Sequence, residues 1–597
     1  MKNFLKMILA VVIGILIAGF ITTFITIGII GAAGSAGKKT GTMPKDAVLR
    51  IDLSETVIAE QTQEANPLKS IQGNSNVRII GIWDAVQAIN AAASDPNVKF
   101  IYLKTDGNAN DVTHLQEFRA ALAAFRTSGK AVISYMETAT TGDYYLASVS
   151  DKVFMTSHPG ATTMMTGIGT QMVFLKDLLD KLGVNVQLIR HGKYKSAGEM
   201  FVRNSPSPEN LEQYQVMIAS MWASLSSEIA ASREISVEDL NRCIDDLTLV
   251  RPEDFVKEKL VDELLTREEL KARLTTFAVA DRFDDIHMVS LGDYVDIRNA
   301  VPAKASRSIA VIYADGEIVD GSDVKEVAGD RFASVIAKVR ADSTVKAVVL
   351  RVNSPGGSVL ASEKIKTELD LLKKEKPLIA SYGSYAASGG YWISNNCDRI
   401  FSDATTLTGS IGVFGMVPDF SRTARDIAHV NVTTVTSNKH GGMYSLMRPL
   451  DNAEKAFMLS SIEDIYDRFT SIVSEGRSLE KSYVDEIGQG RVWTGSDARE
   501  KGLVDEIGTL EDAVRYAAIC AGDGEVGNWK VTGYPKPLTS IEIIMEMLGQ
   551  KKKNEENILA GTALESVSRT MLNWAEAAKE GRSDVVFARL PYQLAIR

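Results

Sequence analysis

The sequence predicts an α/β protein made of two tandem copies of one domain, preceded by an N-terminal transmembrane helix. The segment LIASYGSYAASGGYWISNNCDRIF, from Leu378, aligns with AVISYMETATTGDYYLASVSDKVF, from Ala131, at an offset of 247 positions. The β-branched runs VKFIYLK at Val98 and VKAVVLR at Val345 keep the same offset, and each is followed by a turn and a helical stretch. Strands that alternate with helices in this way favour parallel strands covered by helices.

The alignment of the two copies continues toward the end of each. GVNVQLI at Gly183 corresponds to HVNVTTV at His429 at an offset of 246, and KLVDELL at Lys259 to GLVDEIG at Gly502 at an offset of 243. A slowly changing offset indicates small loop insertions between homologous domains. We therefore expect an N-terminal domain at residues 44–288, a C-terminal domain at 289–535 and a tail at 536–597, in which LESVSRTMLNWAEAA predicts a short helix.

Composition excludes several classes of function. Hydrophobic residues at 45% and charged residues at 24% describe an ordinary globular protein, too long at 597 residues for a single core. The net charge of -10 disfavours nucleic acid as a partner. Because Cys243, Cys397 and Cys520 lack metal-ligand spacing and the six histidines are dispersed, we expect no metal and no other cofactor.

Residues 1–43 predict a membrane anchor. No charged residue lies between Lys6 and Lys38, which exceeds the roughly 20 apolar residues of a membrane-spanning helix and the 7 to 15 of a signal-peptide core. A cleaved signal peptide is the alternative, with GAAGSAG as its cleavage site. Lys2 and Lys6 favour a cytoplasmic N-terminus, although Lys38 beyond the span weakens that argument. We expect a single-pass protein of the cell (inner) membrane with its catalytic part on the extracytoplasmic side.

Ser388 is the strongest candidate nucleophile. It lies in AASGG, before an apolar helical stretch, and the first copy has Thr141 in its place and Asp143 in the place of Gly390. A serine at a helix start can expose its hydroxyl, and the amide of Gly389 can stabilise an oxyanion. The plain alternative is a helix N-cap.

A second candidate element is the turn in LRVNSPGGSV. Adjacent glycines, Gly356 and Gly357, allow backbone amides to approach a ligand, and the helix that follows presents unpaired N–H groups. This equipment suits an oxyanion hole, although a tight turn could also serve only to reverse the chain. The first copy has DGNAN there, without the paired glycines.

The residues alone do not decide which side chain is the general base. His429 and His440 are the histidines of the C-terminal domain, so a Ser-His-Asp triad is one alternative. Lys195, in KYKSA of the first copy, is the other, because Gly441 stands at its place in the second copy. A lysine is usually a solvated surface charge, and it can act as a base only if its pKa is lowered.

Taken together, GSYAASGGYWIS, RVNSPGGSV, TGSIGVFG and GKYKSA resemble the signal peptide peptidases of the SppA or protease IV type, in the long tandem-domain form. The resemblance implies domains similar to the ClpP and crotonase superfamily and a membrane-anchored serine protease. It implies Ser388 as nucleophile and Lys195 as base of a Ser/Lys dyad. KYKSAGEMF departs from the family near Gly198, where family members often have other residues, and this concerns the substrate pocket.

The same resemblance implies further residues and partners. Ser410, in TGSIG, would orient the lysine, and the amides of Gly357, Gly389 and Gly356 would form the oxyanion hole. It also implies a homotetramer that degrades signal peptides and other apolar segments in the membrane. Two other functions compete with this expectation: a crotonase-like acyl-CoA enzyme and a non-catalytic membrane scaffold.

Overall fold

The structure is a computed structural model that describes residues 42–64, 77–301, 305–539, 542 and 586–589. The predicted membrane anchor and the predicted helix of the tail lie outside these residues, apart from the last residues of the anchor segment. Within the described part, no helix has the length and apolar character needed to cross a bilayer.

The first half of the chain forms a six-stranded parallel sheet. Its strand order is β10-β7-β5-β4-β1-β11. The strands are β1 (Ala47–Asp52), β4 (Val98–Lys104), β5 (Val132–Met136), β7 (Lys152–Thr156), β10 (Glu263–Leu265) and β11 (Met288–Ser290). Most of these side chains are buried, as expected for parallel strands covered on both faces.

The second half repeats this architecture. Its eight-stranded sheet contains the order β22-β18-β17-β15-β12, which matches β10-β7-β5-β4-β1 strand for strand. The strands are β12 (Ser308–Asp315), β15 (Val345–Ser354), β17 (Leu378–Ala387), β18 (Arg399–Ser402), β19 (Leu407–Gly409), β21 (Val492–Thr494), β22 (Glu506–Ile507) and β23 (Lys530–Tyr534). The two tandem α/β copies predicted from the internal alignment are confirmed.

The helices repeat in the same order. In the first copy they are α3 (Ile82–Ser94), α4 (Val112–Arg126), α5 (Thr141–Ala147), α8 (Pro208–Arg233), α9 (Val237–Asp245), α10 (Pro252–Lys257) and α11 (Arg267–Ala278). Their counterparts are α13 (Gly329–Ala341), α14 (Val359–Lys373), α15 (Gly389–Ser394), α16 (Asn452–Arg477), α17 (Lys481–Ile487), α18 (Gly495–Glu500) and α19 (Leu510–Cys520). The predicted long helices α8 and α16 have the same length, 26 residues.

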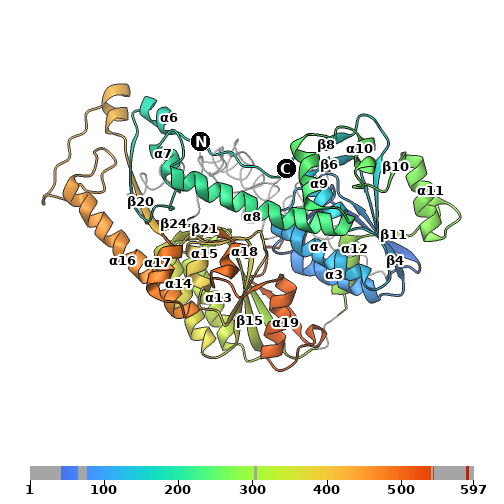
Figure 1. Ribbon diagram of the computed structural model, residues 1–597. Coiled ribbons are helices and arrows are strands. Elements are labelled where there is room, and N and C mark those ends of the chain that lie inside the picture. The colour runs from blue at the N-terminus through green and yellow to red at the C-terminus, as the bar shows by residue number, and fades with distance from the viewer. Residues whose placement is uncertain (1–41, 65–76, 302–304, 540–541, 543–585, 590–597) are drawn as a thin grey trace, which may run out of the picture.

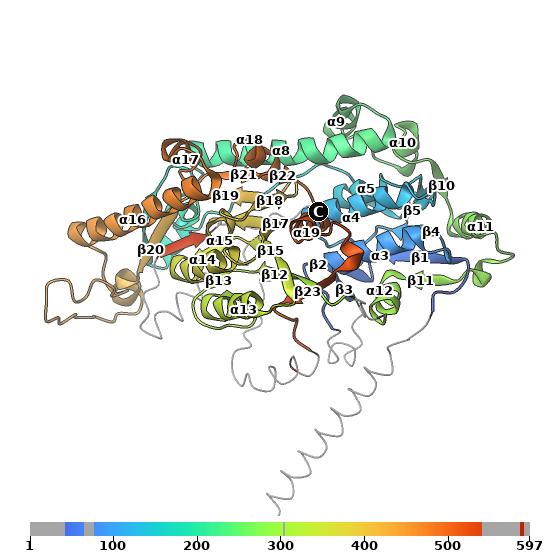
Figure 2. The same cartoon turned by 90° about the horizontal axis from the view of Figure 1, so that it is seen from below.

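Helix α8 belongs to the first copy but also packs on the second. Figures 1 and 2 show it running along the molecule across both halves. Its side chains Tyr214, Met217 and Met221 share a buried cluster with Leu407 and Val492 of the second half. The helix therefore fixes the two halves relative to each other.

A third, mixed sheet joins residues from both halves. Its order is β14-β13-β16-β24-β20-β9. The strands are β9 (Asn185–His191), β13 (Ile318–Val319), β14 (Val327–Ala328), β16 (Gly356–Ser358), β20 (Val413–Asp419) and β24 (Val586–Arg589). The pairing of β9 with β20 connects the first copy directly to the second, and β24 comes from the C-terminal tail.

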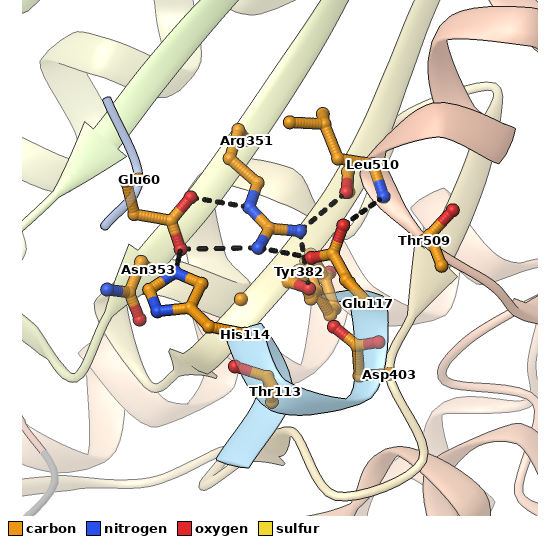
Figure 3. A network of polar contacts seen from close by, with 12 residues as sticks. Glu60, Thr113, His114, Glu117, Arg351, Asn353, Tyr382, Asp403, Thr509 and Leu510 are labelled. Atoms are coloured by element: carbon orange, nitrogen blue, oxygen red, sulfur yellow. Dashed lines mark hydrogen bonds and ion pairs between the residues drawn. The ribbon is translucent and has the colours of Figure 1, made fainter. Parts of the chain in front are cut away.

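A buried ionic cluster closes the junction between the halves (Figure 3). Arg351, on β15, donates to Glu60 at 2.7 Å and to Glu117, on α4, at 2.6 Å. His114 lies 3.1 Å from Glu60. Burial alone would raise the pKa of Glu60, but the neighbouring Arg351 and His114 outweigh it and lower that pKa to about 2. Breaking one partner of such a buried pair costs about 3 to 5 kcal/mol.

Two features differ from the sequence-based expectations. Strand β11 and helix α12 (Leu291–Asn299) pack on the first sheet, so its last elements come from residues on both sides of the expected boundary at 288/289. In addition, the two copies differ more than their alignment indicates, because HVNVTTV from His429 forms no strand, whereas GVNVQLI in the first copy overlaps β9. A β-branched run needs a paired neighbour to form a strand, and the described residues offer none there.

Candidate active site

Ser388 lies where β17 ends and α15 begins. Its side chain is fully buried, and its backbone has φ 56° and ψ -113°, a strained conformation for a residue with a side chain. It occupies the N-cap position of α15, but its hydroxyl makes no capping hydrogen bond. The geometry therefore does not support the plain N-cap interpretation.

The other serines of this segment make ordinary structural contacts. Ser384 Oγ lies 2.9 Å from Thr113 Oγ1, and Ser394 Oγ donates to the Gly390 carbonyl oxygen at 2.8 Å. Neither shares a hydrogen bond with Lys195, in contrast to Ser388.

Lys195 reaches Ser388 from the other half of the chain. It follows β9, and its Nζ lies 2.8 Å from Ser388 Oγ, 2.9 Å from Ser410 Oγ and 3.1 Å from the Ser410 carbonyl oxygen. The side chain is buried, and this burial lowers the pKa of Lys195 from 10.5 to about 7. A substantial fraction of this lysine is therefore neutral near pH 7, with a lone pair available to accept a proton.

The buried carboxylate of Glu199 holds the loop that carries Lys195. Arg190 donates to the Lys195 carbonyl oxygen at 2.9 Å and to Glu199 Oε1 at 3.1 Å. Glu199 also accepts hydrogen bonds from the backbone N–H and the hydroxyl of Ser207, at 3.0 and 2.7 Å. Burial would raise the pKa of Glu199, but these hydrogen bonds and Arg190 lower it overall. The carboxylate is thus charged and anchors the loop.

Gly490 allows the second half to approach the lysine. A Cβ at this position would lie 2.5 Å from Lys195 Cβ and 2.6 Å from its Cα, and the backbone has φ +81°. The adjacent Gln489 accepts a hydrogen bond from the Tyr194 N–H at 2.9 Å. A side chain at position 490 would therefore push the lysine loop away from Ser388.

The glycine turn and the start of α15 are in direct contact. A Cβ on Gly389 would lie 3.1 Å from the Gly357 nitrogen, and one on Gly357 would lie 1.9 Å from the Ile318 carbonyl oxygen. The Gly356 N–H donates to Ser354 Oγ at 3.2 Å. Of the three expected oxyanion donors, the amides of Gly357 and Gly389 thus lie together, whereas that of Gly356 is already used.

The two histidines of the C-terminal domain, the alternative bases, are not at this site. His440 is paired with Glu454 at 3.1 Å in an exposed region, and His429 is exposed, whereas Ser388 is fully buried. His440, Asp451 and Glu454 form the candidate metal group of the described residues. Arg448 already donates to both oxygens of Glu454, at 2.8 and 2.6 Å, which leaves that carboxylate poorly suited to a metal ion.

Two groups of this site were not predicted from the sequence. Gly490 belongs to GRVWTG, in which the sequence predicts no site residue. Glu199 belongs to KYKSAGEMF, in which the sequence predicts Lys195 as a site residue and a difference near Gly198. The GQG sequence before Arg491 was a possible signal, because a glycine in such a motif often marks a close backbone approach.

Comparison with known proteins identifies the class of enzyme. A profile described as Peptidase family S49 matches residues 124–280 and again 370–522, one match in each copy. Protease 4 from Haemophilus influenzae is 33% identical over 92% of this chain and 91% of its own length. A putative signal peptide peptidase SppA from Enterococcus faecium is 37% identical over 31% of this chain and 53% of its own. The chain is therefore a serine protease with two related domains.

With one profile match in each copy and a relative aligned over nearly the whole length, the chain belongs to peptidase family S49. Membership of this peptidase family supports a serine protease over the two competing expectations, an acyl-CoA enzyme and a non-catalytic scaffold. A ClpP1 mutant from Listeria monocytogenes aligns with 34% of this chain and 93% of its own at 14% identity and a TM-score of 0.24. The finer assignment to the ClpP and crotonase superfamily stays a prediction.

Proposed function

We propose that this chain is a membrane-anchored serine endopeptidase whose Ser388–Lys195 dyad degrades signal peptides left in the membrane after export. The observation that carries the proposal is the 2.8 Å separation of Lys195 Nζ and Ser388 Oγ, at a site where burial lowers the lysine pKa to about 7. A nucleophile within hydrogen-bond reach of a base with a matched pKa is the requirement for covalent catalysis.

In the acylation step, Ser388 Oγ attacks the carbonyl carbon of the peptide bond, and its proton passes to Lys195 Nζ. The carbonyl oxygen becomes an oxyanion, which the N–H groups of Gly357 and Gly389 stabilise. The C–N bond then breaks, and the Lys195 ammonium donates its proton to the leaving amine. Ser410 keeps the amine oriented, because its hydroxyl and carbonyl oxygen both lie within 3.1 Å of Nζ.

In the deacylation step, a water molecule attacks the ester carbonyl carbon of the acyl-enzyme, and neutral Lys195 takes a proton from this water. The bond between this carbon and Ser388 Oγ breaks, and Lys195 returns the proton to the serine. The products are two peptides and the free enzyme. No metal ion or cofactor takes part in either step.

The mixed sheet supports an extended peptide as substrate. Strand β24 lies between β16 and β20 and is antiparallel to both. Without it, the edge of the glycine turn and the edge of β20 would face each other across a space about two strand spacings wide, roughly 9.5 Å. An extended peptide would bind there through its backbone and depend little on sequence, which suits the varied apolar segments of signal peptides.

The location and assembly that we propose follow from the apolar N-terminal segment and from the family that the sequence resembles. Residues 1–43 would anchor the chain in the cell membrane with the catalytic part on the extracytoplasmic side, and four copies would assemble. The printed name of the Enterococcus faecium relative, a putative signal peptide peptidase, supports the substrate class. Removal of residues 1–43 should release the protein from the membrane fraction, and retention there would contradict the anchor.

Activity on a fluorogenic apolar peptide tests the dyad. Ser388→Ala and Lys195→Met in the full chain should each lower kcat/KM by at least about 1,000-fold. Lys193→Met is the matched control, because Lys193 lies two residues away, is exposed, and has its amine over the Tyr194 ring at 5.2 Å from the centroid. A Lys195→Met protein that hydrolyses the peptide at the wild-type rate would refute the assignment.

Two further measurements separate this mechanism from a histidine-dependent one. A serine-reactive phosphonate should add its mass to the peptide that contains Ser388 and to no peptide of Ser388→Ala. His429→Ala and His440→Ala should keep wild-type kcat, since neither ring reaches the buried serine in this structure. Loss of activity in either histidine variant, with Lys195→Met active, would favour a triad instead.

A further inference from the structure

The residue that precedes the proposed base is held in place by two hydrogen bonds. Tyr194 adjoins Lys195 and is 8% exposed. Its N–H donates to the Gln489 carbonyl oxygen at 2.9 Å, and its hydroxyl donates to Glu212 Oε2, on α8, at 3.0 Å. Because Lys195 shares a peptide bond with Tyr194, a shift of this ring would displace the amine as well.

Arg491, in the second half of the chain, lies against the ring of Tyr194. Its Cζ is 4.6 Å from the centroid of this ring and 4.5 Å from the centroid of the Trp493 ring. Its guanidinium also lies 3.1 Å from Glu212 Oε1, on the carboxylate that accepts from the Tyr194 hydroxyl. A planar guanidinium suits such ring contacts and can bind a carboxylate at the same time. One side chain of the second copy thus contacts both the ring and its hydrogen-bond partner.

Trp493 gives this arginine a fixed support. It lies on β21, where it pairs with Thr408 of β19, and its indole N–H donates to the Ile487 carbonyl oxygen at 3.0 Å. Trp493 is 9% exposed, and the side chain of Arg491 is 16% exposed. Closely packed side chains such as these have few alternative rotamers. The arginine therefore connects a fixed ring of the second copy to the ring that precedes Lys195.

The backbone of Arg491 supports the other neighbour of the amine. Ser410, whose hydroxyl and carbonyl oxygen lie within 3.1 Å of Lys195 Nζ, donates its N–H to the Arg491 carbonyl oxygen at 2.7 Å. Ser410 has φ 50°, in the left-handed region, which is costly for a residue with a side chain. The Arg491 N–H donates in turn to the Gly488 carbonyl oxygen at 2.9 Å. Arg491 therefore contacts the residue before the amine and the residue that accepts hydrogen bonds from it.

We propose that Arg491 is a positioning residue for Lys195. It acts through the contact of its planar guanidinium with the ring of Tyr194 and through its backbone bond to Ser410. This inference rests on the proposed function, in which Lys195 is the base. The charge of the arginine is not what lowers the lysine pKa, because burial is the cause of that shift. Loss of the guanidinium should instead loosen the lysine loop, admit water to the amine and raise its pKa.

The pH profile of kcat for Arg491→Met in the full chain tests this role. Active sites are counted with the serine-reactive phosphonate, so that unfolded protein does not enter kcat. The midpoint, expected at about 7 from the lysine pKa, should rise by about one unit, with KM for the fluorogenic apolar peptide unchanged. The neutral fraction near pH 7 then falls from about 50% to about 10%, so kcat falls about fivefold there and recovers near pH 10. A merely structural role would reduce the number of active sites and leave the midpoint where it was.

Two further variants separate the planar contact from charge and from general packing. Lys501→Met removes another cation from the Trp493 ring, which the Lys501 Nζ approaches to 4.2 Å, and leaves the Tyr194 contact in place, so the midpoint should not move. Arg491→Lys keeps the positive charge but loses the planar group, so its midpoint should be raised as in Arg491→Met. A wild-type midpoint in Arg491→Lys would mean that charge alone is enough and would overturn the proposal.

A double-variant cycle shows whether the arginine acts through Tyr194. Because both changes break the same contact, Tyr194→Leu with Arg491→Met should lose about as much kcat as one single variant, whereas a loss equal to the product of the two would contradict this route. A wild-type midpoint in Arg491→Met while Lys195→Met is inactive would overturn the positioning role and leave the dyad standing. An active Lys195→Met would instead refute the dyad, and this inference with it.

Discussion

Gly490→Ala is the perturbation that tests most directly how the site keeps Lys195 neutral. The new methyl group would lie 2.5 Å from Lys195 Cβ, so the lysine loop must move away from the buried pocket. Burial is the cause of the lowered lysine pKa, from 10.5 to about 7, and the shift corresponds to about 5 kcal/mol at about 1.4 kcal/mol per pKa unit. Access of water to the amine should therefore return its pKa toward 10.5.

The sign and size of the effect follow from the neutral fraction of the lysine. In the wild-type protein, kcat/KM should rise with pH, because the base acts only when neutral, and the neutral fraction grows from about 10% near pH 6 to about 90% near pH 8. If Gly490→Ala restores about two pKa units, the neutral fraction near pH 7 falls from about 50% to about 1%. The loss is then about 50-fold near pH 7 and largely disappears near pH 10.

The assay is kcat/KM on a fluorogenic apolar peptide between about pH 5.5 and pH 10, the range over which the two neutral fractions diverge. Gly527→Ala is the control, because a Cβ at Gly527 meets nothing within 4 Å. A Gly490→Ala enzyme that is weakened equally at every pH, with its midpoint still near 7, would show that the glycine does not control the environment of the lysine. A wild-type profile without a rise through neutral pH would refute the role of Lys195 itself.

Three further predictions concern the surroundings of the dyad. Ser410→Ala removes the hydroxyl that accepts from Lys195 Nζ but keeps the carbonyl oxygen of residue 410, 3.1 Å from Nζ. The kcat should therefore fall about tenfold with KM unchanged. An unchanged kcat would contradict the orienting role. Glu199→Gln leaves Arg190 without its carboxylate, so the free energy of unfolding in urea should fall by about 1 to 3 kcal/mol. The midpoint of the pH profile should rise as well, and a fall in stability alone would limit Glu199 to a role in the fold. Deletion of residues 586–597 removes β24 from between β16 and β20. Because the substrate then no longer has to displace this strand, KM should decrease with kcat unchanged. An increase in KM would mean that the strand helps to bind substrate.

The sequence predicts the repeated architecture well because the signal is local. Buried parallel strands are continuous apolar runs, and the alignment of two such runs, at Val98 and Val345, survives in the structure as β4 and β15. Ser388 and Lys195 are candidates because each differs from its counterpart in the other copy, whereas their roles as nucleophile and base are implied by the family resemblance. That comparison needs only the order of residues and no knowledge of distances.

The remaining parts of the site depend on contacts between residues far apart in the chain. Gly490 touches Lys195 only after the two halves dock, and Arg351 meets Glu60 across 291 positions of sequence. Strand propensity also limits what the sequence can predict. HVNVTTV and GVNVQLI have similar composition, but among the described residues only GVNVQLI contributes to a strand, because it has a partner, β20, in the same chain.

The division of the proposed dyad between the two halves of the chain also concerns the synthesis of the protein. Lys195 and Ser388 are 193 positions apart, and the Arg351 cluster lies at the junction of the two halves that carry them. During synthesis, Lys195 is made before Ser388, so under the proposed mechanism the nascent chain should have no peptidase activity until its second half is complete. Mild denaturation that separates the halves should likewise silence the enzyme before either core melts, which makes peptidase activity a sensitive report of correct docking.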